Sequence, residues 1–329
     1  MKPKNEHISA HFTGAFAALA DEYISLNRAI GNKYNLDTVY LMQFDKYCVD
    51  EKAAAPILTK ELFDGWCAKR SYESDRSHHI RIRTLRRFAD FLRKNGIEAP
   101  TAFHPLPRLL PSFTPYIFTR AEISRFLIAA SSAKSNSHSP LAGLVLPLLF
   151  KTLYCCGLRL SEVLTLKNPS VDLVCGTFLI LDAKGGKDRL VPMSESLRLL
   201  CVEYRENPLI QRFNSEYFFS APDGGLYSKS WIYVRFRNFL QQAGISHGGR
   251  GKGPRLHDIR YTYAVHTLDN WAREERDMLV VLPILSAYLG HKNIFATQRY
   301  LRLTPEAYPV LLGAFDKHFG SVFPEVRYE

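Results

Sequence analysis

The sequence predicts a mainly α-helical fold with one small β-sheet, organised as a helical amino-terminal domain followed by an α+β domain. Apolar residues recur at helical spacing over most of the chain, and the spacing changes towards that of strands only between Val171 and Pro192. Five prolines fall between residues 96 and 115, in a run that can continue neither a helix nor a central strand. We therefore expect a helical domain at residues 1–96, a proline-rich linker at 97–117 and a second domain at 118–329.

Four helices are expected in the first domain, at Phe12–Leu26, Val39–Cys48, Leu58–Cys67 and Ile80–Leu92. The fourth carries many more cations than acids. Its apolar positions Leu85, Phe88 and Leu92 share one side, so we expect the cations on the exposed side. A solvated helix surface usually mixes both signs, so the excess of cations favours contact with phosphate groups. The arginines that we assign to this contact are Arg81, Arg83, Arg86 and Arg87.

The second domain begins with a capping box formed by Thr119 and Glu122, which predicts the start of a helix. A small β-hairpin follows later, where two strand-like segments flank a turn that is rich in glycine and lysine. The expected elements are a helix at Leu141–Cys156, strands at Thr177–Leu181 and Arg189–Val191 around the turn Ala183–Asp188, helices from Tyr227 onward with a glycine-rich loop at His247–Pro254, and a last helix at Pro305–His318.

The composition favours a globular protein with a polyanionic partner. The 329 residues are 46% hydrophobic and 23% charged, and the formal net charge is +11. Charge alone leaves nucleic acid and an acidic membrane surface as alternatives. The most apolar stretch, Leu141–Phe150, is interrupted by Pro147 and is much shorter than the roughly 20 apolar residues that span a bilayer. We therefore expect no membrane segment.

Neither a targeting signal nor a metal-binding cysteine pattern is expected. The segment Met1–Glu6 is polar and no apolar core follows it, so we expect no secretory signal. The six cysteines contain no CxxC pair and no zinc spacing. We interpret them as buried thiols in a reducing compartment, which predicts a cytoplasmic location.

Chemistry-bearing residues form five short clusters in the second domain. In chain order they are Arg159 in Cys156-Gly-Leu-Arg-Leu-Ser-Glu162, Lys184 on the hairpin turn, His257-Asp-Ile-Arg260, His291 after Leu289-Gly290, and Tyr300 nine residues later. Each cluster alone has an ordinary structural explanation. A histidine can cap a helix, an arginine after a helix end can bind carbonyl groups, and most tyrosines pack in cores or interfaces. The order and spacing of all five together are much more specific.

In this order and spacing, the five clusters resemble those of the tyrosine recombinase/integrase family. The resemblance covers about residues 119–304, and more loosely the helical domain, which it implies is a SAM-like core DNA-binding domain. It implies a site-specific recombinase that acts on double-stranded DNA through a 3′-phosphotyrosine on Tyr300, in the integration, transposition or resolution of a mobile element. Because the helical domain starts almost at once, we expect the compact, Xer-like or transposon-encoded type.

Elementary chemistry agrees with the roles that the resemblance implies. Displacement at a phosphodiester concentrates negative charge on its non-bridging oxygens, which the guanidiniums of Arg159 and Arg260 can neutralise. Nearby cations favour phenoxide character at a tyrosine, and a lysine on a hairpin can protonate the departing 5′-oxygen. His257 is expected either to assist proton transfer or to bind a phosphate oxygen. His291 is expected to hydrogen-bond the phosphate, and Glu162 to orient a cation in a supporting role.

No cofactor is expected, because the phosphotyrosine bond conserves the energy of the broken phosphodiester. The chain lacks a GxxxxGK[ST] motif, and neither Glu162 nor Asp258 has a carboxylate neighbour that would suggest a magnesium site. The loop His247–Pro254 could be mistaken for a nucleotide loop, but no Ser or Thr follows its lysine. We interpret it as a basic loop close to DNA. The additional cations assigned to DNA are Lys187, Arg250 and Lys252.

Two residue assignments have rivals. Lys187 shares the hairpin turn with Lys184, and the resemblance favours Lys184. Tyr308 rivals Tyr300 as the nucleophile, but the spacing from His291 favours Tyr300.

The resemblance implies that the last helix docks on a neighbouring subunit, in a tetrameric synapse on DNA of identical or related recombinase subunits. The apolar positions available for this contact are Val310, Leu311, Phe315 and Phe319. The alternative is packing against its own domain. Competing functions are a type IB topoisomerase, a catalytically silent DNA-binding protein and a metal-dependent nuclease.

Overall fold

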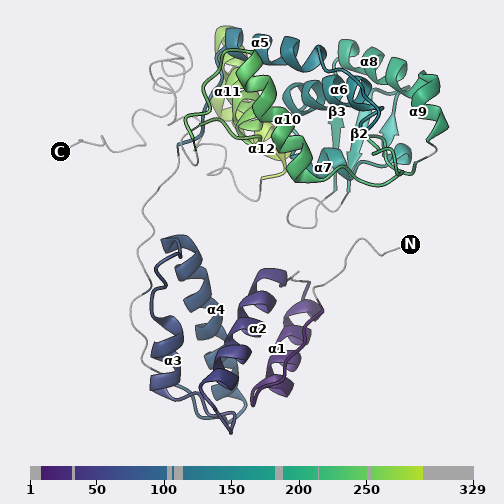
Figure 1. The fold of residues 1–329 in the computed structure, drawn as a ribbon. Helices are drawn as coiled ribbons and strands as arrows, with labels where there is room; N and C mark the ends of the chain where they lie inside the picture. Colours follow the sequence, from purple (N-terminus) through teal and green to yellow (C-terminus); the bar gives the residue numbers. More distant parts are fainter. Residues whose placement is uncertain are drawn as a thin grey trace. The chain divides into compact units, whose positions relative to one another are not determined.

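The chain divides into two compact units, residues 1–113 and 114–329 (Figure 1). The division falls inside the segment 97–117 that the prolines mark in the sequence. The computed structural model describes residues 9–31, 34–101, 106, 114–181, 188–213, 215–249 and 253–291. The predicted fold class is confirmed, because both units are mainly helical and the second contains a small sheet.

The first unit contains four helices, close to the predicted ranges: α1 (Ala17–Ala29), α2 (Asn35–Asp50), α3 (Lys60–Cys67) and α4 (Asp75–Lys94). The start of α1 lies later than expected. Phe16 is buried as its apolar spacing predicts, but the backbone before it is not helical. The Asp45 carboxylate of α2 accepts hydrogen bonds from the backbone of Thr13 (2.7 Å) and Gly14 (3.0 Å), which fixes this entry segment in another conformation.

Helix α4 buries Leu85, Phe88 and Leu92, as its apolar spacing predicts. It also buries Arg81, whose exposed fraction is 0%. The Arg81 guanidinium donates to both oxygens of Glu73, at 2.9 and 2.6 Å, and to carbonyl groups at the end of α3. The expectation that Arg81 contacts DNA is therefore wrong, because its donors are used inside the unit. Of the other arginines assigned to phosphate, Arg87 is exposed, whereas Arg83 and Arg86 are partly buried.

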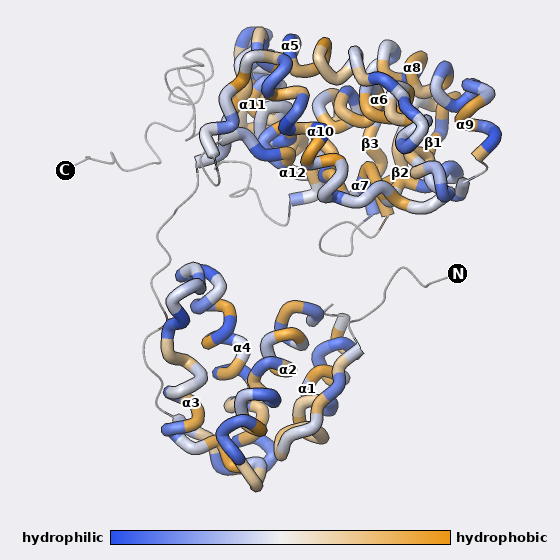
Figure 2. Tube along the Cα trace, in the orientation of Figure 1, coloured by the Kyte–Doolittle hydropathy of each residue, from blue (hydrophilic) through white to orange (hydrophobic). Residues whose placement is uncertain are grey.

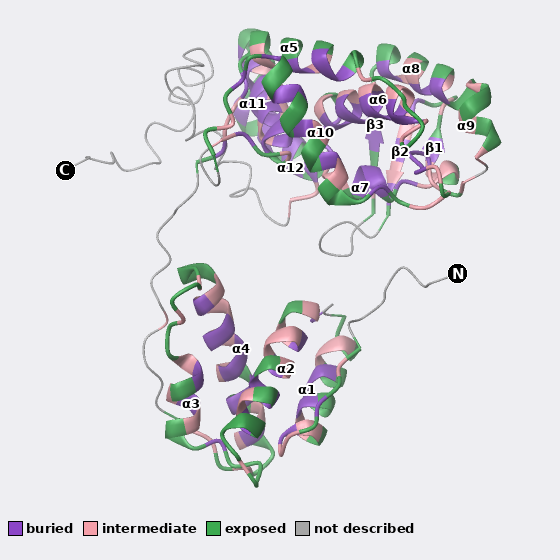
Figure 3. Ribbon diagram, in the orientation of Figure 1, coloured by how far each residue is buried: buried purple, intermediate pink, exposed green. Residues whose placement is uncertain are grey.

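The second unit is built around one buried apolar helix, α6 (Ala142–Cys155). Figure 2 shows apolar residues along this helix, and Figure 3 shows that most of it is buried. Helices α5 (Arg120–Ser131), α8 (Glu195–Glu206) and α11 (Asp258–Arg273) contact it. The capping box of Thr119 and Glu122 is present at the start of α5, as predicted.

The sheet of this unit has three antiparallel strands in the order β1 (Val171–Asp172), β2 (Thr177–Ile180) and β3 (Arg189–Pro192). The predicted hairpin is confirmed as the pair of β2 and β3, in a register that places Phe178 opposite Val191. Both side chains are fully buried and join the core around α6. Because side chains alternate along a strand, this register also turns Arg189 towards the interior.

The remaining helices are α7 (Leu160–Leu164), α9 (Pro208–Arg212), α10 (Lys229–Gln242) and α12 (Met278–Leu289), with a 3-10 turn at Asn168–Ser170. We predicted no element between Pro192 and Tyr227, where α8 and α9 lie. Helices α11 and α12 pack on each other through a separate apolar cluster that includes Leu268, Leu282 and Leu289. None of the helices within the described ranges is both long and apolar enough to cross a membrane.

The cysteines only partly follow the sequence prediction. All six thiols are free, and Cys48, Cys156 and Cys201 are buried. Cys155 and Cys175 are exposed, so the expectation that the cysteines are uniformly buried is wrong for these two. Cys155 is the last residue of α6, and Cys175 lies in the tight turn between β1 and β2. Both positions are at the ends of elements, where a side chain is less often covered by the core.

Candidate active site

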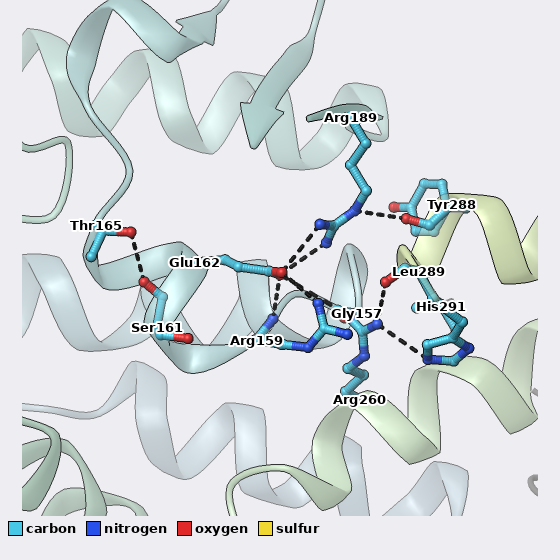
Figure 4. A network of polar contacts seen from close by, with 10 residues as sticks. All are labelled: Gly157, Arg159, Ser161, Glu162, Thr165, Arg189, Arg260, Tyr288, Leu289 and His291. Carbon is cyan, nitrogen blue, oxygen red and sulfur yellow. Dashed lines mark hydrogen bonds and ion pairs between the residues drawn. The ribbon is translucent and has the colours of Figure 1, made fainter. Parts of the chain in front are cut away.

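Four segments that are distant in the sequence meet at one point of the second unit (Figure 4). They are the turn and start of α7 with Arg159 and Glu162, the first residue of β3, the first turn of α11 with Arg260, and the end of α12 with His291. Arg159, Glu162, Arg260 and His291 are thus brought together as polar neighbours. Three of the five clusters that the sequence analysis singled out, those of Arg159, Arg260 and His291, are parts of one site.

The carboxylate of Glu162 lies at the centre of this site. It accepts hydrogen bonds from the backbone N–H (2.9 Å) and the Nη1 atom (2.7 Å) of Arg159, which directly precedes α7. The Nη1 and Nη2 atoms of Arg189 donate to its two oxygens at 3.1 and 2.9 Å. Burial raises the pKa of Glu162, but hydrogen bonds from Arg189 and Arg159 outweigh this effect and lower the pKa to about 2. Glu162 is therefore ionised near neutral pH and holds an arginine, as a supporting residue would.

Arg260 is almost completely buried, with 2% of its surface exposed. Its Nη1 donates to the carbonyl oxygen of Gly157 at 2.8 Å, and its Nη2 donates to that of Leu289. Gly157 can aim its carbonyl group in this way because it adopts the left-handed conformation, with φ of +56°. A Cβ atom at this position would lie 2.3 Å from the Tyr263 ring, so glycine is required there for both reasons.

His291 follows Gly290, which ends α12 in the left-handed conformation with φ of +64°. Its backbone N–H donates to the carbonyl oxygen of Ser286 at 3.0 Å, which fixes the turn. The Nε2 atom lies 3.4 Å from Nη2 of Arg260, and since a guanidinium only donates, Nε2 is an acceptor and the ring proton is on Nδ1. Burial, followed by the charges of Arg260 and Arg159, lowers the pKa of His291 to about 4. The imidazole is therefore neutral at neutral pH.

His257 lies at the edge of this site, exposed at the start of α11. Its ring contacts the Tyr261 ring edge to face, with centroids 5.2 Å apart. The next residue, Asp258, is fully buried and accepts a hydrogen bond from the backbone of Arg255 at 2.8 Å. This bond fixes the end of the glycine-rich loop on α11. Burial raises the pKa of Asp258 to about 6 despite that bond.

Arg189 is the residue of this site that the sequence analysis missed. We placed it only in a strand, although a signal was present. In a strand of period two, Arg189 lies on the same face as the buried Val191. A cation on the inner face of a strand requires a carboxylate partner, which predicts an ion pair with an acid such as Glu162.

Several predicted site residues lie outside the described part of the chain. These are Lys184, Lys187, Arg250, Lys252 and Tyr300, together with the rival Tyr308 and the last helix at Pro305–His318. Their assignments stay predictions. Within the described ranges, no group of three or more His, Cys, Asp or Glu side chains is arranged to hold a metal ion.

Comparison with known proteins identifies the family. The phage integrase family model matches residues 118–307. An integrase/recombinase of Sinorhizobium fredii is 31% identical over 299 residues, which cover 88% of this chain and 94% of the relative. The tyrosine recombinase XerA of Pyrococcus horikoshii is 23% identical over an alignment that covers 92% of this chain and 93% of the relative.

Solved structures share the fold. Lambda integrase residues 75–356, bound to DNA, match with a TM-score of 0.59 at 16% identity and cover 89% of this chain and 97% of that one. The integrase of transposon Tn1549, in complex with a circular intermediate DNA, matches with the same TM-score at 18% identity, with 86% and 94% covered.

The family match, with which the fold agrees, defines an enzyme that cleaves and rejoins DNA strands at specific sites. The chain belongs to the phage integrase family, which is the family of the tyrosine recombinases. The resemblance inferred from the motifs is confirmed.

Proposed function

We propose that this chain binds a specific site in double-stranded DNA and transfers the 3′ end of a cleaved strand to Tyr300. The observation that carries this proposal is the convergence of Arg159, Arg260 and His291, held by Glu162 and two backbone carbonyl groups. Three such groups around one point suit a phosphodiester whose charge grows during displacement.

Arg159 is well suited to hold the phosphate. Glu162 binds its Nη1 atom, and among the described residues Nε and Nη2 of Arg159 have no hydrogen-bond partner. Its side chain is 19% exposed, so the other edge of the guanidinium can reach a bound phosphate. Arg260, which is more deeply buried, then contributes charge, and the neutral His291 contributes a hydrogen bond.

The remaining steps use residues whose roles follow from the family resemblance. Tyr300, after losing its phenolic proton to give the phenoxide that nearby cations favour, attacks phosphorus, the P–O bond to the 5′-oxygen breaks, and Lys184 delivers a proton to that oxygen. His257 assists proton transfer or binds a phosphate oxygen. Rejoining reverses these steps with a 5′-hydroxyl as the nucleophile, so that no ATP is consumed.

DNA is the partner that the charge and the relatives support. The solved structures of similar fold include lambda integrase and the Tn1549 integrase, both in complex with DNA. We assign the further DNA contacts to Arg83, Arg86, Arg87, Lys187, Arg250 and Lys252. The helical domain at 1–96 serves as a core DNA-binding domain and 97–117 as the linker. The last helix docks identical or related subunits into a tetrameric synapse, and we place this activity in the cytoplasm.

Covalent capture of DNA tests the proposal. Nicked duplexes cut from the DNA that borders the gene are incubated with the chain and analysed for protein–DNA adducts that resist SDS. We expect an adduct with the wild type and with Tyr308→Phe, and none with Tyr300→Phe. EDTA is expected to leave its yield unchanged. The absence of a wild-type adduct, or an adduct that persists in Tyr300→Phe, contradicts the proposal.

A further inference from the structure

Arg189, the first residue of β3, uses all three nitrogens of its guanidinium inside the active site (Figure 4). Nη1 and Nη2 donate to the Glu162 carboxylate, and Nε donates to the carbonyl oxygen of Tyr288 at 2.9 Å. The side chain is 10% exposed. One arginine thus connects the base of the β-hairpin, the start of α7 and the end of α12.

The first connection fixes Glu162, and Glu162 in turn holds Arg159. Arg189 binds the carboxylate with two parallel N–H···O bonds, a geometry that sets the plane of the carboxylate as well as its position. Oε1, which accepts from Arg189, also accepts from Nη1 of Arg159 at 2.7 Å. Rotation of the carboxylate would therefore move the guanidinium of Arg159.

The second connection fixes the end of α12. The last carbonyl groups of a helix have no partner within the helix. Here Arg189 binds that of Tyr288, and Arg260 binds that of Leu289. Gly290 passes close to Arg189, since a Cβ atom at this position would lie 3.3 Å from its Nη1. Tyr288 and Leu289, which precede Gly290 and His291, are thus both held by guanidiniums.

We propose that Arg189 is a positioning residue for DNA strand cleavage, which holds Arg159 through Glu162 and His291 through the end of α12. The inference rests on the function proposed above and adds a residue to that same site. It requires a guanidinium specifically, because a lysine ammonium cannot make a bidentate pair with a carboxylate and also reach a third acceptor in a fixed plane.

Arg198 provides a matched control elsewhere in the unit. It donates Nε and Nη2 to Glu195, at 2.7 and 2.6 Å, and Nη1 to the carbonyl oxygen of Leu173. The pattern of one carboxylate and one carbonyl group is the same, but the pair lies on the surface of α8, with Glu195 67% exposed. Replacing Arg198 removes the same kinds of bond outside the active site.

The experiment compares Arg189→Gln and Arg189→Lys with Arg198→Gln and Arg198→Lys. Single-turnover cleavage of a nicked duplex is measured at saturating protein, and DNA affinity is measured separately. At metal sites, replacing a residue that orients a ligand typically lowers activity by about 10- to 100-fold, and we expect a loss of the same order here. We expect this loss in both Arg189 variants, with DNA affinity within about twofold of wild type, and near wild-type cleavage in both Arg198 variants.

The pH profile separates positioning from general loss of structure. Among the groups that lower the pKa of Glu162, the hydrogen bond from Arg189 contributes most, and it acts against burial. Removing this hydrogen bond in Arg189→Gln therefore raises the pKa of Glu162. As the pH is lowered, the variant is expected to lose cleavage activity at a higher pH than the wild type does. The ¹³C NMR signal of the Glu162 carboxyl group, assigned with Glu162→Gln, reports the same rise in the free protein. Arg198→Gln is expected to leave both curves unchanged.

Failure of this inference is distinguishable from failure of the proposed function. If the wild type forms no adduct, the proposed function is wrong, and the NMR titration still decides whether Arg189 sets the charge state of Glu162. If the wild type is active and either Arg189 variant cleaves within about twofold of it, the inference is overturned. A loss confined to DNA affinity, or an unchanged Glu162 titration, overturns it as well.

Discussion

Replacing Gly157 with alanine is expected to damage both the stability and the activity of the second unit. The residue has φ of +56°, and left-handed backbone costs a residue with a Cβ about 1–2 kcal/mol. The new methyl group would also lie 2.3 Å from the Tyr263 ring. Overpacking of this kind costs about 1–3 kcal/mol, so the expected loss is about 2–5 kcal/mol in the free energy of unfolding.

Gly244→Ala is the matched control, because Gly244 also has positive φ (+67°) but nothing lies within 4 Å of its added Cβ. It is expected to lose only the conformational part, about 1–2 kcal/mol. Urea unfolding is followed by tryptophan fluorescence in a Trp66→Phe background, so that the signal comes from Trp231 and Trp271 in the second unit. Equal losses for the two glycine variants would refute the steric argument.

The activity of Gly157→Ala provides a second readout. Its carbonyl group accepts from Nη1 of Arg260, so a shift of the backbone away from Tyr263 displaces that guanidinium. Under conditions where the variant is folded, we expect strand cleavage to fall while DNA affinity is kept. Full cleavage by folded Gly157→Ala would mean that the carbonyl group does not position Arg260.

Three further predictions concern charge. Arg81→Ala leaves the Glu73 side chain, 6% exposed, without its partner and is expected to cost about 3–5 kcal/mol in urea unfolding, with DNA affinity of the folded protein unchanged. Arg87→Ala is expected to keep the stability and to weaken DNA binding, reducing the slope of the binding constant against salt concentration by about 1 in a salt titration. An Arg81→Ala variant that keeps its stability but loses DNA affinity would contradict these two assignments. Because burial raises the pKa of Asp258 from 3.8 to about 6, the folded state binds more protons than the unfolded state between these values, and stability falls as pH rises through that window. Asp258→Asn removes this dependence, so its unfolding free energy relative to wild type is expected to rise by up to about 3 kcal/mol between pH 4 and 6.5, and a flat difference would refute the assignment.

Local patterns were sufficient to predict most of the fold. Helical spacing located α2, α3 and α4, the capping box located the start of α5, and the change to strand spacing located the hairpin of β2 and β3. The start of α1 was misplaced because it is decided by hydrogen bonds from Thr13 and Gly14 to Asp45, some thirty residues away. Periodicity within a window cannot detect such a bond.

The same reason explains the two arginines that were misjudged. Arg81 lies four residues before Leu85 and therefore on the apolar side of α4, but its partners, Glu73 and the carbonyl groups of Trp66 and Ala68, lie before the helix and could not be paired with it from spacing. Arg189 was taken as an ordinary strand residue because its partner Glu162 precedes it by 27 positions. Motif order identified Arg159, Arg260 and His291, which the structure brings together, whereas the groups that hold them in place depend on tertiary contacts.

The arrangement around Glu162 has a consequence for chimeric enzymes. The hairpin of β2 and β3 looks like a module that could be exchanged between relatives, because its two strands are neighbours in the sequence and pair with each other. Its first residue on the returning strand, however, donates two of the hydrogen bonds that hold a carboxylate in another segment. A donor hairpin without an arginine at position 189 would place a buried anion beside Arg159 with one guanidinium fewer. Exchange of this hairpin is therefore expected to succeed when the donor carries an arginine at position 189, and otherwise only when residues 162 and 189 are transferred as a pair.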